Sequence, residues 1–461
     1  MASLLAISFI LIPLFRDGMF MDGVLYSAVA SNLAKGHGSF WDPSFSPTLY
    51  PHFHEQPPFG LWLQSLFFWD GASRFPERIF DFLVFLFTVI GMLIFWKSLH
   101  FNYSSWPILL WISIPTVQWG IVNNVLEQPM AFFDLLSVFF FWKNFQRGTS
   151  PSFVFISLAL FFLFLASFTK GIQGLFPLVA PIIFAFIFRR NYFSAFISFL
   201  IVLVGIILAY ALLIRMIPSA MDSYKAYFVS RFDGFPNTRH ANTEYRIALL
   251  ATLLLQLGIP ILLSLLVRWF NCNNENGQKS IPDLIHPMTY AFFLIGASAS
   301  LPIMLTHEQR GFYLNTSMPF YSMGLACWSY ANLSKIEAWL LELPKVFGRI
   351  CRSLLLFLGL AVCAFFIFLE IPKRDNKKLT DMKQIAKAIY PNERVGVDSE
   401  TWSDWGLQNY FMRNHAIALD PDTSRCLWYL MPMKKYTTTP NGFEGTKVKV
   451  SGYYLFRRKS K

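Results

Sequence analysis

Carboxylates and imidazoles gather in one long polar stretch near the start of the chain, residues 16–78. This stretch contains six Asp or Glu residues, three histidines and many aromatic residues. A positioned carboxylate can accept a proton from a nucleophile, and a carboxylate beside imidazoles can bind a divalent metal. Polar loops of this length are usually functional or disordered, and the aromatic content argues against disorder. We therefore expect residues 16–78 to supply part of an active site.

Asp22 stands at the start of a segment with helical spacing. Apolar positions recur every three or four residues until Gly36-His37-Gly38, and they are Val24, Leu25, Ala28, Val29 and Leu33. The pattern predicts an amphipathic helix that lies along the membrane surface. A carboxylate at the start of such a helix can serve as an N-cap, as a catalytic base or as both, because the capping position also fixes it at the surface.

A second motif in this stretch reads His52-Phe53-His54-Glu55-Gln56-Pro57-Pro58. The two prolines restrict the backbone, so the preceding imidazoles and carboxylate are held in an extended, exposed segment. Two histidines and a glutamate this close together could bind a divalent metal. A polar turn beside a membrane would have the same composition, and both interpretations remain open.

Two carboxylates follow around the start of a later apolar segment. Glu127 lies just before Pro129, where it could cap the helix or act in catalysis. Asp134 lies farther inside the same segment. An acid within a membrane span faces a polar interior or a partner, so it indicates a functional site.

Cations occupy two other short turns. Lys170 stands in the tight turn Thr169-Lys170-Gly171, and Arg310 directly precedes the aromatic segment 311–313. Each could bind a phosphate, or could instead anchor its helix at the lipid headgroups. His240 lies in the polar stretch 215–246, where a lone histidine is usually only solvated.

Membrane-spanning helices must position these turns. Hydrophobic residues make up 54% of the 461 positions, charged residues make up 14%, and the mean hydropathy is +0.43, which excludes an ordinary soluble globule. A helix needs about 20 apolar residues to cross the hydrocarbon core. Eleven spans are expected, at 2–15, 79–96, 105–121, 129–142, 152–168, 172–188, 193–214, 247–267, 286–305, 311–331 and 353–371. The first lacks a cationic segment and a cleavage site, so we expect an uncleaved anchor.

The distribution of lysine and arginine predicts the orientation of these spans. One set of loops (97–104, 143–151, 189–192, 268–285 and 332–352) holds 11 Lys or Arg and 4 Asp or Glu. The other set (16–78, 122–128, 169–171, 215–246 and 306–310) holds 11 of each over nearly twice the length. The first set is therefore expected in the cytoplasm, and residues 16–78 on the outer side.

The composition changes from residue 372 onward. This tail has 17 Lys or Arg against 9 Asp or Glu. A helix over 379–390 and strands over 394–397, 415–419 and 447–456 predict a small external α+β domain without a catalytic motif. We expect two domains, a transmembrane domain at 1–371 and this domain at 372–461.

Charge and cysteine content exclude other classes of protein. The formal net charge of +12 comes mostly from the cytoplasmic loops and the tail, where basic residues meet anionic lipid headgroups. No nucleic-acid-binding module is visible. The five cysteines show neither a CxxC motif nor paired spacing, so no disulfide framework and no zinc cluster is indicated.

The order of the polar motifs resembles that of the C-type polytopic membrane glycosyltransferases. The motifs are Asp22 to Tyr26, HFHEQPP with GLWLQSLFF after it, NNVLEQP, FTKGIQGLFPL and HEQRGFYLNTSMP, and they cover roughly residues 1–330. Within these enzymes the likeness is greatest to the group that contains the lipid A aminoarabinose transferase and the protein O-mannosyltransferases. The resemblance implies transfer of a sugar from a polyprenyl-phosphate donor to lipid A, another glycolipid, a glycan or a protein. It also implies a multi-pass protein of the bacterial cytoplasmic membrane with its active site on the external, periplasmic face.

The resemblance also implies roles for single residues. Asp22, Glu55 and Glu127 are the candidate catalytic carboxylates. The candidate ligands of the donor phosphate are Lys170, Arg310, His54 and Tyr26, and Glu55 with His240 would hold a divalent metal if the site uses one. The chain departs from the family pattern at Gly23, where a second acid is usual, and at Gln56, where a lysine is usual.

Two other classes of function fit the composition. A secondary transporter or lipid flippase would also be polytopic, but such proteins tend to show internal repeats and broken helices at mid-membrane. Here no repeat is found, and the polar residues gather in the external loops. A non-catalytic scaffold in envelope assembly is the third interpretation. The all-α polytopic fold with eleven spans, a helical first external loop and a small α+β domain is common to all three.

Overall fold

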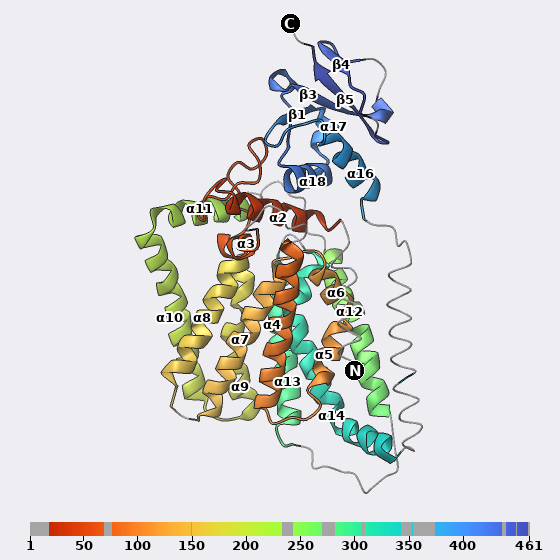
Figure 1. The fold of residues 1–461 in the computed structure, drawn as a ribbon. Coiled ribbons are helices and arrows are strands. Elements are labelled where there is room, and N and C mark those ends of the chain that lie inside the picture. The colour runs from red at the N-terminus through yellow and green to blue at the C-terminus, as the bar shows by residue number, and fades with distance from the viewer. Residues whose placement is uncertain are drawn as a thin grey trace. The chain divides into compact units, whose positions relative to one another are not determined.

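A computed structural model describes most of the chain as helical, with one small sheet near the C-terminus (Figure 1). The described residues are 18–68, 76–148, 150–232, 243–269, 282–306, 309–342, 353, 374–435, 439–448 and 450–459. The chain forms two compact units. The first comprises Met1–Leu14 and Phe80–Leu369, and the second comprises Phe15–Ile79 and Glu370–Lys461. Each unit is built around its own hydrophobic core.

All the regular elements among the described residues of the first unit are helices. Its elements are α4 (Pro76–Ser98, which begins in the other unit), α5 (Ser105–Ile112), α6 (Pro115–Ile121), α7 (Glu127–Gln146), α8 (Phe153–Lys170), η1 (Gly171–Val179), α9 (Ala180–Phe188), α10 (Tyr192–Met216), α11 (Pro218–Phe232), α12 (Thr243–Trp269), α13 (Ile285–Ser300), η3 (Leu301–Leu305), η4 (Gly311–Ser317) and α14 (Met318–Glu342). Large aromatic side chains fill the core, where Phe95 contacts the rings of Phe139 and Phe292 at 5.5 and 5.4 Å between centroids. Edge-to-face pairs of this kind add to the stabilisation from burial.

Five helical stretches among the described residues are long and apolar enough to cross a membrane. They are Pro76–Ser98, Phe153–Phe188, Tyr192–Met216, Ile247–Trp269 and Ile285–Leu305. The expected count of eleven spans is not confirmed. The spans expected at 2–15 and 353–371 lie outside the described residues, apart from Ser353.

One expected span differs from the observed helices, and the reason is local. The segment 105–121 forms two short helices, because Pro115 starts a new helix after the extended residue Ile114. The stretch Phe153–Phe188 turns at Gly171, whose φ of 78° ends α8, and η1 then packs back along α8. The tight turn expected at Lys170 is therefore present.

The second unit joins the polar stretch near the N-terminus with the C-terminal segment. Its elements are α2 (Met21–Ala34), α3 (Pro58–Ser65), α16 (Asn376–Ile385), β1 (Arg394–Val397), α17 (Ser399–Trp402), α18 (Trp405–His415), β2 (Ala418–Asp420), η5 (Thr423–Arg425), β3 (Trp428–Pro432), η6 (Met433–Lys435), β4 (Phe443–Gly445) and β5 (Tyr453–Arg458). The sheet order is β2-β1-β3-β5-β4. Strand β1 is parallel to β2 and β3, and β5 is antiparallel to β3 and β4. The predicted small α+β fold is therefore present, although the sequence pattern did not indicate α18, β3 or β4.

Helix α2 is not the amphipathic surface helix that the spacing predicted. Every residue from Gly23 to Asn32 is buried. The helix packs against α3 on one side and α18 on another, so its polar positions are covered as well as its apolar ones. Met19 and Val24 belong to the same hydrophobic core as Leu407 and Phe411 of α18. The segment 16–78 and the C-terminal segment thus form one structural unit that is discontinuous in sequence.

Polar contacts also connect α18 with the start of α2. The Asn409 side-chain amide donates to the carbonyl of Met21 at 2.9 Å, and the Tyr410 hydroxyl contacts the backbone of Met19 at 3.0 Å. Arg413 donates to the Ser27 hydroxyl at 2.7 Å and to Glu77 at 2.6 Å. The Arg413 and Glu77 side chains are only 12% and 5% exposed, so this ion pair is largely shielded from water.

We expect Arg413→Met to loosen α2. Leaving Glu77 buried without its partner should destabilise the second unit by about 3 kcal/mol. Hydrogen–deuterium exchange of the full-length protein in lipid nanodiscs should then show faster exchange in peptides covering residues 21–34, while peptides of α7 keep their protection. Arg425→Met is the matched control, because Arg425 pairs with Asp422 at an exposed site in the same unit. Equal protection of residues 21–34 in both variants would contradict this role of Arg413.

Candidate functional site

Two helix ends in the first unit bring a buried lysine and a buried glutamate together. Glu127 is the first residue of α7, and Lys170 is the last residue of α8. The Lys170 ammonium donates a hydrogen bond to Oε1 of Glu127, and both side chains are almost completely buried. A helix dipole favours a negative charge at the N-terminus and a positive charge at the C-terminus, so each helix stabilises the charge at its own end. The sequence proposed both residues for the site but did not indicate that they form a pair.

Glu127 is not a helix cap. The N-cap of α7 is Leu126, and no side-chain capping bond is present there. The Glu127 carboxylate instead faces Lys170, and its second oxygen, Oε2, is buried without a hydrogen-bond partner among the described residues. The functional interpretation of Glu127 therefore fits the geometry better than the capping one.

Aromatic rings of η4 cover the lysine. The Lys170 ammonium lies 4.9 Å from the ring centre of Tyr313 and 5.7 Å from that of Phe312. These distances allow cation–π attraction, which is strongest where water is excluded. Phe312 also stacks on Trp119, with 5.4 Å between ring centres. The aromatic residues that follow Arg310 therefore surround Lys170. The sequence did not predict this contact.

Buried amides lie next to this pair. Asn315 of η4 is 2% exposed, and neither atom of its side-chain amide has a hydrogen-bond partner among the described residues. A Cβ atom at Gly120 would clash with the side-chain amides of both Gln128 and Asn315, so these amides approach the same point on α6. A buried polar atom without a hydrogen-bond partner lowers the stability of the fold, so its presence indicates a binding role. With Oε2 of Glu127, they suit a ligand that offers both donors and acceptors.

Arg310 and Asp134, the other described candidates of the first unit, make no hydrogen bond or ion pair with Glu127 or Lys170. Arg310 is exposed and lies just before η4. Asp134 lies farther along α7, fully buried, and neither carboxylate oxygen has a hydrogen-bond partner among the described residues. His240 lies outside the described residues. The assignments of Arg310 to a phosphate and of His240 to a metal therefore remain predictions.

In the second unit, Asp22 lies in the first turn of α2 but does not cap it. The N-cap is Phe20, without a side-chain capping bond, and Asp22 is the second residue of the helix. Its side chain is only half-buried, while the ten residues from Gly23 to Asn32 are buried. The helix dipole still favours the ionised carboxylate at this end. The capping interpretation is wrong, and an accessible carboxylate at a helix N-terminus remains.

Glu55 is hydrogen-bonded to a tyrosine that lies five residues before it. The Tyr50 hydroxyl is hydrogen-bonded to Glu55, and burial together with this carboxylate raises the pKa of Tyr50 to about 12. Tyr50 also packs on Trp405 at the start of α18, with 5.8 Å between ring centres. The orientation of Glu55 thus depends on the C-terminal segment of the same unit.

Both imidazoles of the HFHEQPP motif face Asp42. Nδ1 of His52 lies 2.9 Å from Oδ1 of Asp42, and Nε2 of His54 lies 3.2 Å from the same oxygen. Burial lowers the pKa of His54 although Asp42 opposes the shift. The lower pKa favours the neutral imidazole, which can form hydrogen bonds to a phosphate but brings no charge to it. Among the described residues there is no group of three His, Cys, Asp or Glu side chains placed to hold a metal ion.

Tyr26 connects α2 with this motif. Its hydroxyl accepts a hydrogen bond of 3.2 Å from the Gln56 side chain, and its ring lies edge-on to Phe53 at 6.5 Å. Both Tyr26 and Gln56 are buried. Asp22 and Glu55 are thereby carried by elements that pack together. The described candidates for catalysis and phosphate binding fall into two sets, which are Glu127, Lys170 and Arg310 in the first unit and Asp22, Tyr26, His54 and Glu55 in the second.

Comparison with known proteins identifies the fold. The chain is similar to the crystal structure of ArnT from Cupriavidus metallidurans bound to undecaprenyl phosphate and to that of the same protein in the apo state. In both cases the TM-score is 0.63 and the sequence identity is 13%, and the alignment covers 98% of this chain and 96% of the other. The sequence matches no protein-family model and no curated protein. The resemblance inferred from the order of the motifs is confirmed at the level of the fold.

We expect the buried pair to show strong energetic coupling. Lys170→Met should destabilise the protein by about 3 kcal/mol or more, because it leaves the Glu127 carboxylate buried without a cation. The double variant Glu127→Gln with Lys170→Met should recover much of that loss, since no unpaired charge remains. Thermal unfolding of the full-length protein in nanodiscs would measure both changes. Arg310→Gln, which removes an exposed cation, should leave the melting temperature unchanged.

The double variant decides whether the two charges depend on each other. If its loss of stability equals the sum of the losses in Lys170→Met and Glu127→Gln, the two charges act independently. The pair would then not be the centre of the site.

Proposed function

We propose that the protein is a membrane glycosyltransferase. It transfers a sugar from a polyprenyl-phosphate carrier to a lipid, glycan or protein acceptor at the outer face of the bacterial cytoplasmic membrane. The observation that carries this proposal is the buried Lys170–Glu127 pair beneath Tyr313, in a chain with the fold of a protein that has been crystallised with undecaprenyl phosphate. A lipid-linked donor has its isoprenoid tail in the bilayer and its sugar at the surface, so the chemistry belongs where apolar helices end.

Lys170 is the proposed ligand of the donor phosphate. An ammonium has three N–H donors, so it can hold the Glu127 carboxylate and a phosphate oxygen together. Its burial makes a charge-assisted bond to phosphate stronger than it would be in water. Glu127 fixes the position of the ammonium, and Arg310 supplies a second, exposed cation beside η4.

The proposed transfer step breaks one bond and forms another. An acceptor hydroxyl oxygen attacks the anomeric carbon of the sugar, and the bond between that carbon and the phosphate oxygen breaks. The polyprenyl phosphate leaves with the electron pair of the broken bond, and Lys170 stabilises its charge. Asp22 accepts the proton of the attacking hydroxyl.

The environment of Asp22 supports its role as the base. The carboxylate lies in the first turn of α2, where the helix dipole favours its ionised form, and it is more exposed than the ten residues that follow it. Asp22 is therefore our first choice for the base, and no step is assigned to a metal.

Asp22→Asn should abolish most of the transfer without unfolding the protein. Asparagine keeps the shape of the side chain but cannot accept a proton, so the rate should fall by about 10²-fold or more. The measurement is sugar transfer by the full-length protein in nanodiscs, with undecaprenyl-phosphate sugars as donors and envelope lipids of a deletion strain as acceptors. Asp422→Asn, a change at an exposed carboxylate of the same unit, should transfer at the wild-type rate. A wild-type rate for Asp22→Asn would make Glu55 or Glu127 the better candidate.

The proposed orientation places the C-terminal segment outside the cytoplasm. In a variant without its native cysteines, Lys447→Cys should react with an impermeant thiol reagent on intact spheroplasts, because Lys447 is exposed. Gln146→Cys, at the exposed end of α7, should react only after lysis. The opposite pattern of labelling would reverse the proposed orientation.

A further inference from the structure

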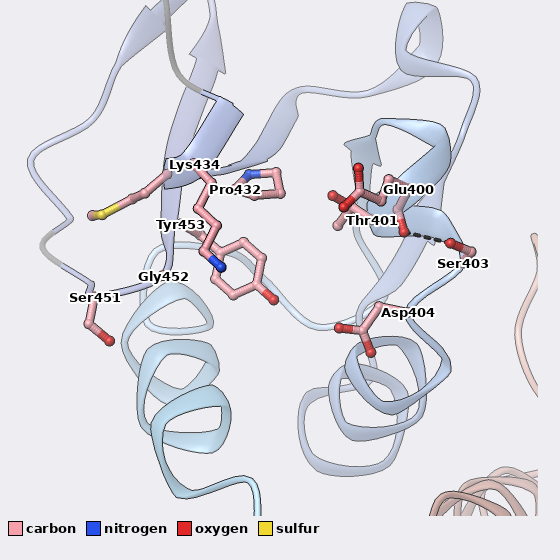
Figure 2. Close-up of a pocket in the computed structure, with 10 residues that line it drawn as sticks. Glu400, Thr401, Ser403, Asp404, Pro432, Lys434, Ser451, Gly452 and Tyr453 are labelled. Carbon is pink, nitrogen blue, oxygen red and sulfur yellow. Dashed lines mark hydrogen bonds between the residues drawn. The ribbon is translucent and has the colours of Figure 1, made fainter.

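The C-terminal half of the second unit contains a cavity that the proposed transfer step does not use (Figure 2). Its volume is about 510 Å³, within the range of pockets that bind small molecules. It is bounded by α17 and the start of α18 on one side and by the segment from β3 to η6 and the start of β5 on the other. The lining combines two carboxylates, one ammonium, four hydroxyls and one aromatic ring, from Glu400, Asp404, Lys434, Ser403, Ser451 and Tyr453 among others.

Hydrogen bonds fix both walls of this cavity. Asp381 of α16 accepts from the backbone amides of Ser451 and Gly452 at 2.8 and 2.7 Å, and the Met433 amide donates to the carbonyl of Gly452 at 2.9 Å. These bonds hold the turn that carries Tyr453. On the other side, Asp404 caps α18 by accepting from the amide of Leu407 at 3.0 Å. The cavity is therefore a built feature of the fold and does not depend on a loose loop.

The charges around the cavity nearly cancel. Glu400 pairs with Lys435 at 2.5 Å, and Asp404 pairs with Lys378 at 2.7 Å. Lys434 adds one further cation to the lining. A polyanionic ligand would meet two carboxylates, and a polycationic one would meet three ammonium groups. The charge balance favours a neutral ligand with many hydrogen-bonding groups.

The aromatic ring gives the cavity an apolar surface between polar ones. Figure 2 shows the ring of Tyr453 in the middle of the view, with Lys434 on one side of it and Asp404 on the other. Pro432 adds a second apolar wall. Burial, with the nearby carboxylates of Asp404 and Asp381, raises the pKa of Tyr453 to about 12, so its hydroxyl stays protonated and can donate.

We propose that this cavity binds a neutral saccharide. A sugar ring has an apolar face of C–H groups, which suits Tyr453 and Pro432, and a rim of hydroxyls, which suits alternating carboxylates, hydroxyls and the Lys434 ammonium. Resting on the transferase function proposed above, the site would hold the sugar part of the acceptor. The C-terminal segment would then contribute to the choice of acceptor.

The test is saccharide binding by the full-length protein in nanodiscs. Maltoside detergents must be absent throughout, because their headgroups are themselves saccharides. An array of immobilised neutral, amino and anionic saccharides should show binding to neutral ones. Tyr453→Ala should weaken that binding by about fivefold or more through the lost ring contact, and Glu400→Gln should weaken it roughly tenfold through lost charge-assisted bonds.

Matched variants separate loss of binding from loss of structure. Tyr453→Phe keeps the ring and should retain most of the binding. Glu444→Gln changes an exposed carboxylate of β4 away from the cavity and should bind like the wild type. Glu400 is 74% exposed, so Glu400→Gln should fold even if Tyr453→Ala does not. Three results would overturn the proposal. They are the absence of binding to any neutral saccharide at millimolar concentration, a preference for anionic saccharides, and equal binding by Glu400→Gln and the wild type.

Binding and transfer can fail separately. Asp22→Asn should bind saccharides like the wild type while it loses transfer. Binding in a protein that transfers no sugar from any polyprenyl-phosphate donor would overturn the proposed function but not the site. Normal transfer by Tyr453→Ala at every acceptor concentration would overturn the role of the site in acceptor choice.

Discussion

A charge that is removed from water must have a partner, and this constraint organises the first unit. Lys170 and Glu127 are both almost completely buried, so neither would be stable without the other. Their pairing fixes the end of α8 against the start of α7. The glycine after Lys170 turns the chain back, and η4 covers the ammonium with two rings. Two helix ends, a turn and two aromatic rings thus meet at one ion pair that is held out of water.

In the second unit, packing against the C-terminal segment positions the carboxylates of Asp22 and Glu55. Asp22 lies on a helix that shares a hydrophobic core with the C-terminal segment, and Glu55 is hydrogen-bonded to Tyr50, which contacts the same segment. Met19 and Val24 share that core with α16 and α18, and Tyr50 packs on Trp405. The small domain without a catalytic motif therefore acts in positioning the carboxylates of the polar stretch.

The sequence predicted the helical fold, the C-terminal α+β segment and most of the residues of the candidate site, because those depend on composition and local pattern. The sequence-based predictions were wrong or incomplete where contacts between distant segments determine the structure. Apolar spacing alone made α2 an amphipathic surface helix, whereas α18 covers it from almost four hundred positions farther along the chain. Adjacency in sequence suggested that His52 and His54 act with Glu55, whereas both face Asp42. The Lys170–Glu127 pair could not be read from the sequence, because opposite charges in separate turns do not reveal which turns meet.

The discontinuous second unit has a consequence for biosynthesis. A ribosome makes residues 18–68 first, yet their core is complete only when α16, α18 and the sheet have been made. The early segment must wait with its apolar side chains exposed while the membrane helices are inserted, and such intermediates are prone to misfolding. The C-terminal segment then completes the hydrophobic core against which residues 18–68 pack. A chain released before that point would carry its carboxylates without the structure that positions them, so the molecule acquires its candidate chemistry only at the end of synthesis.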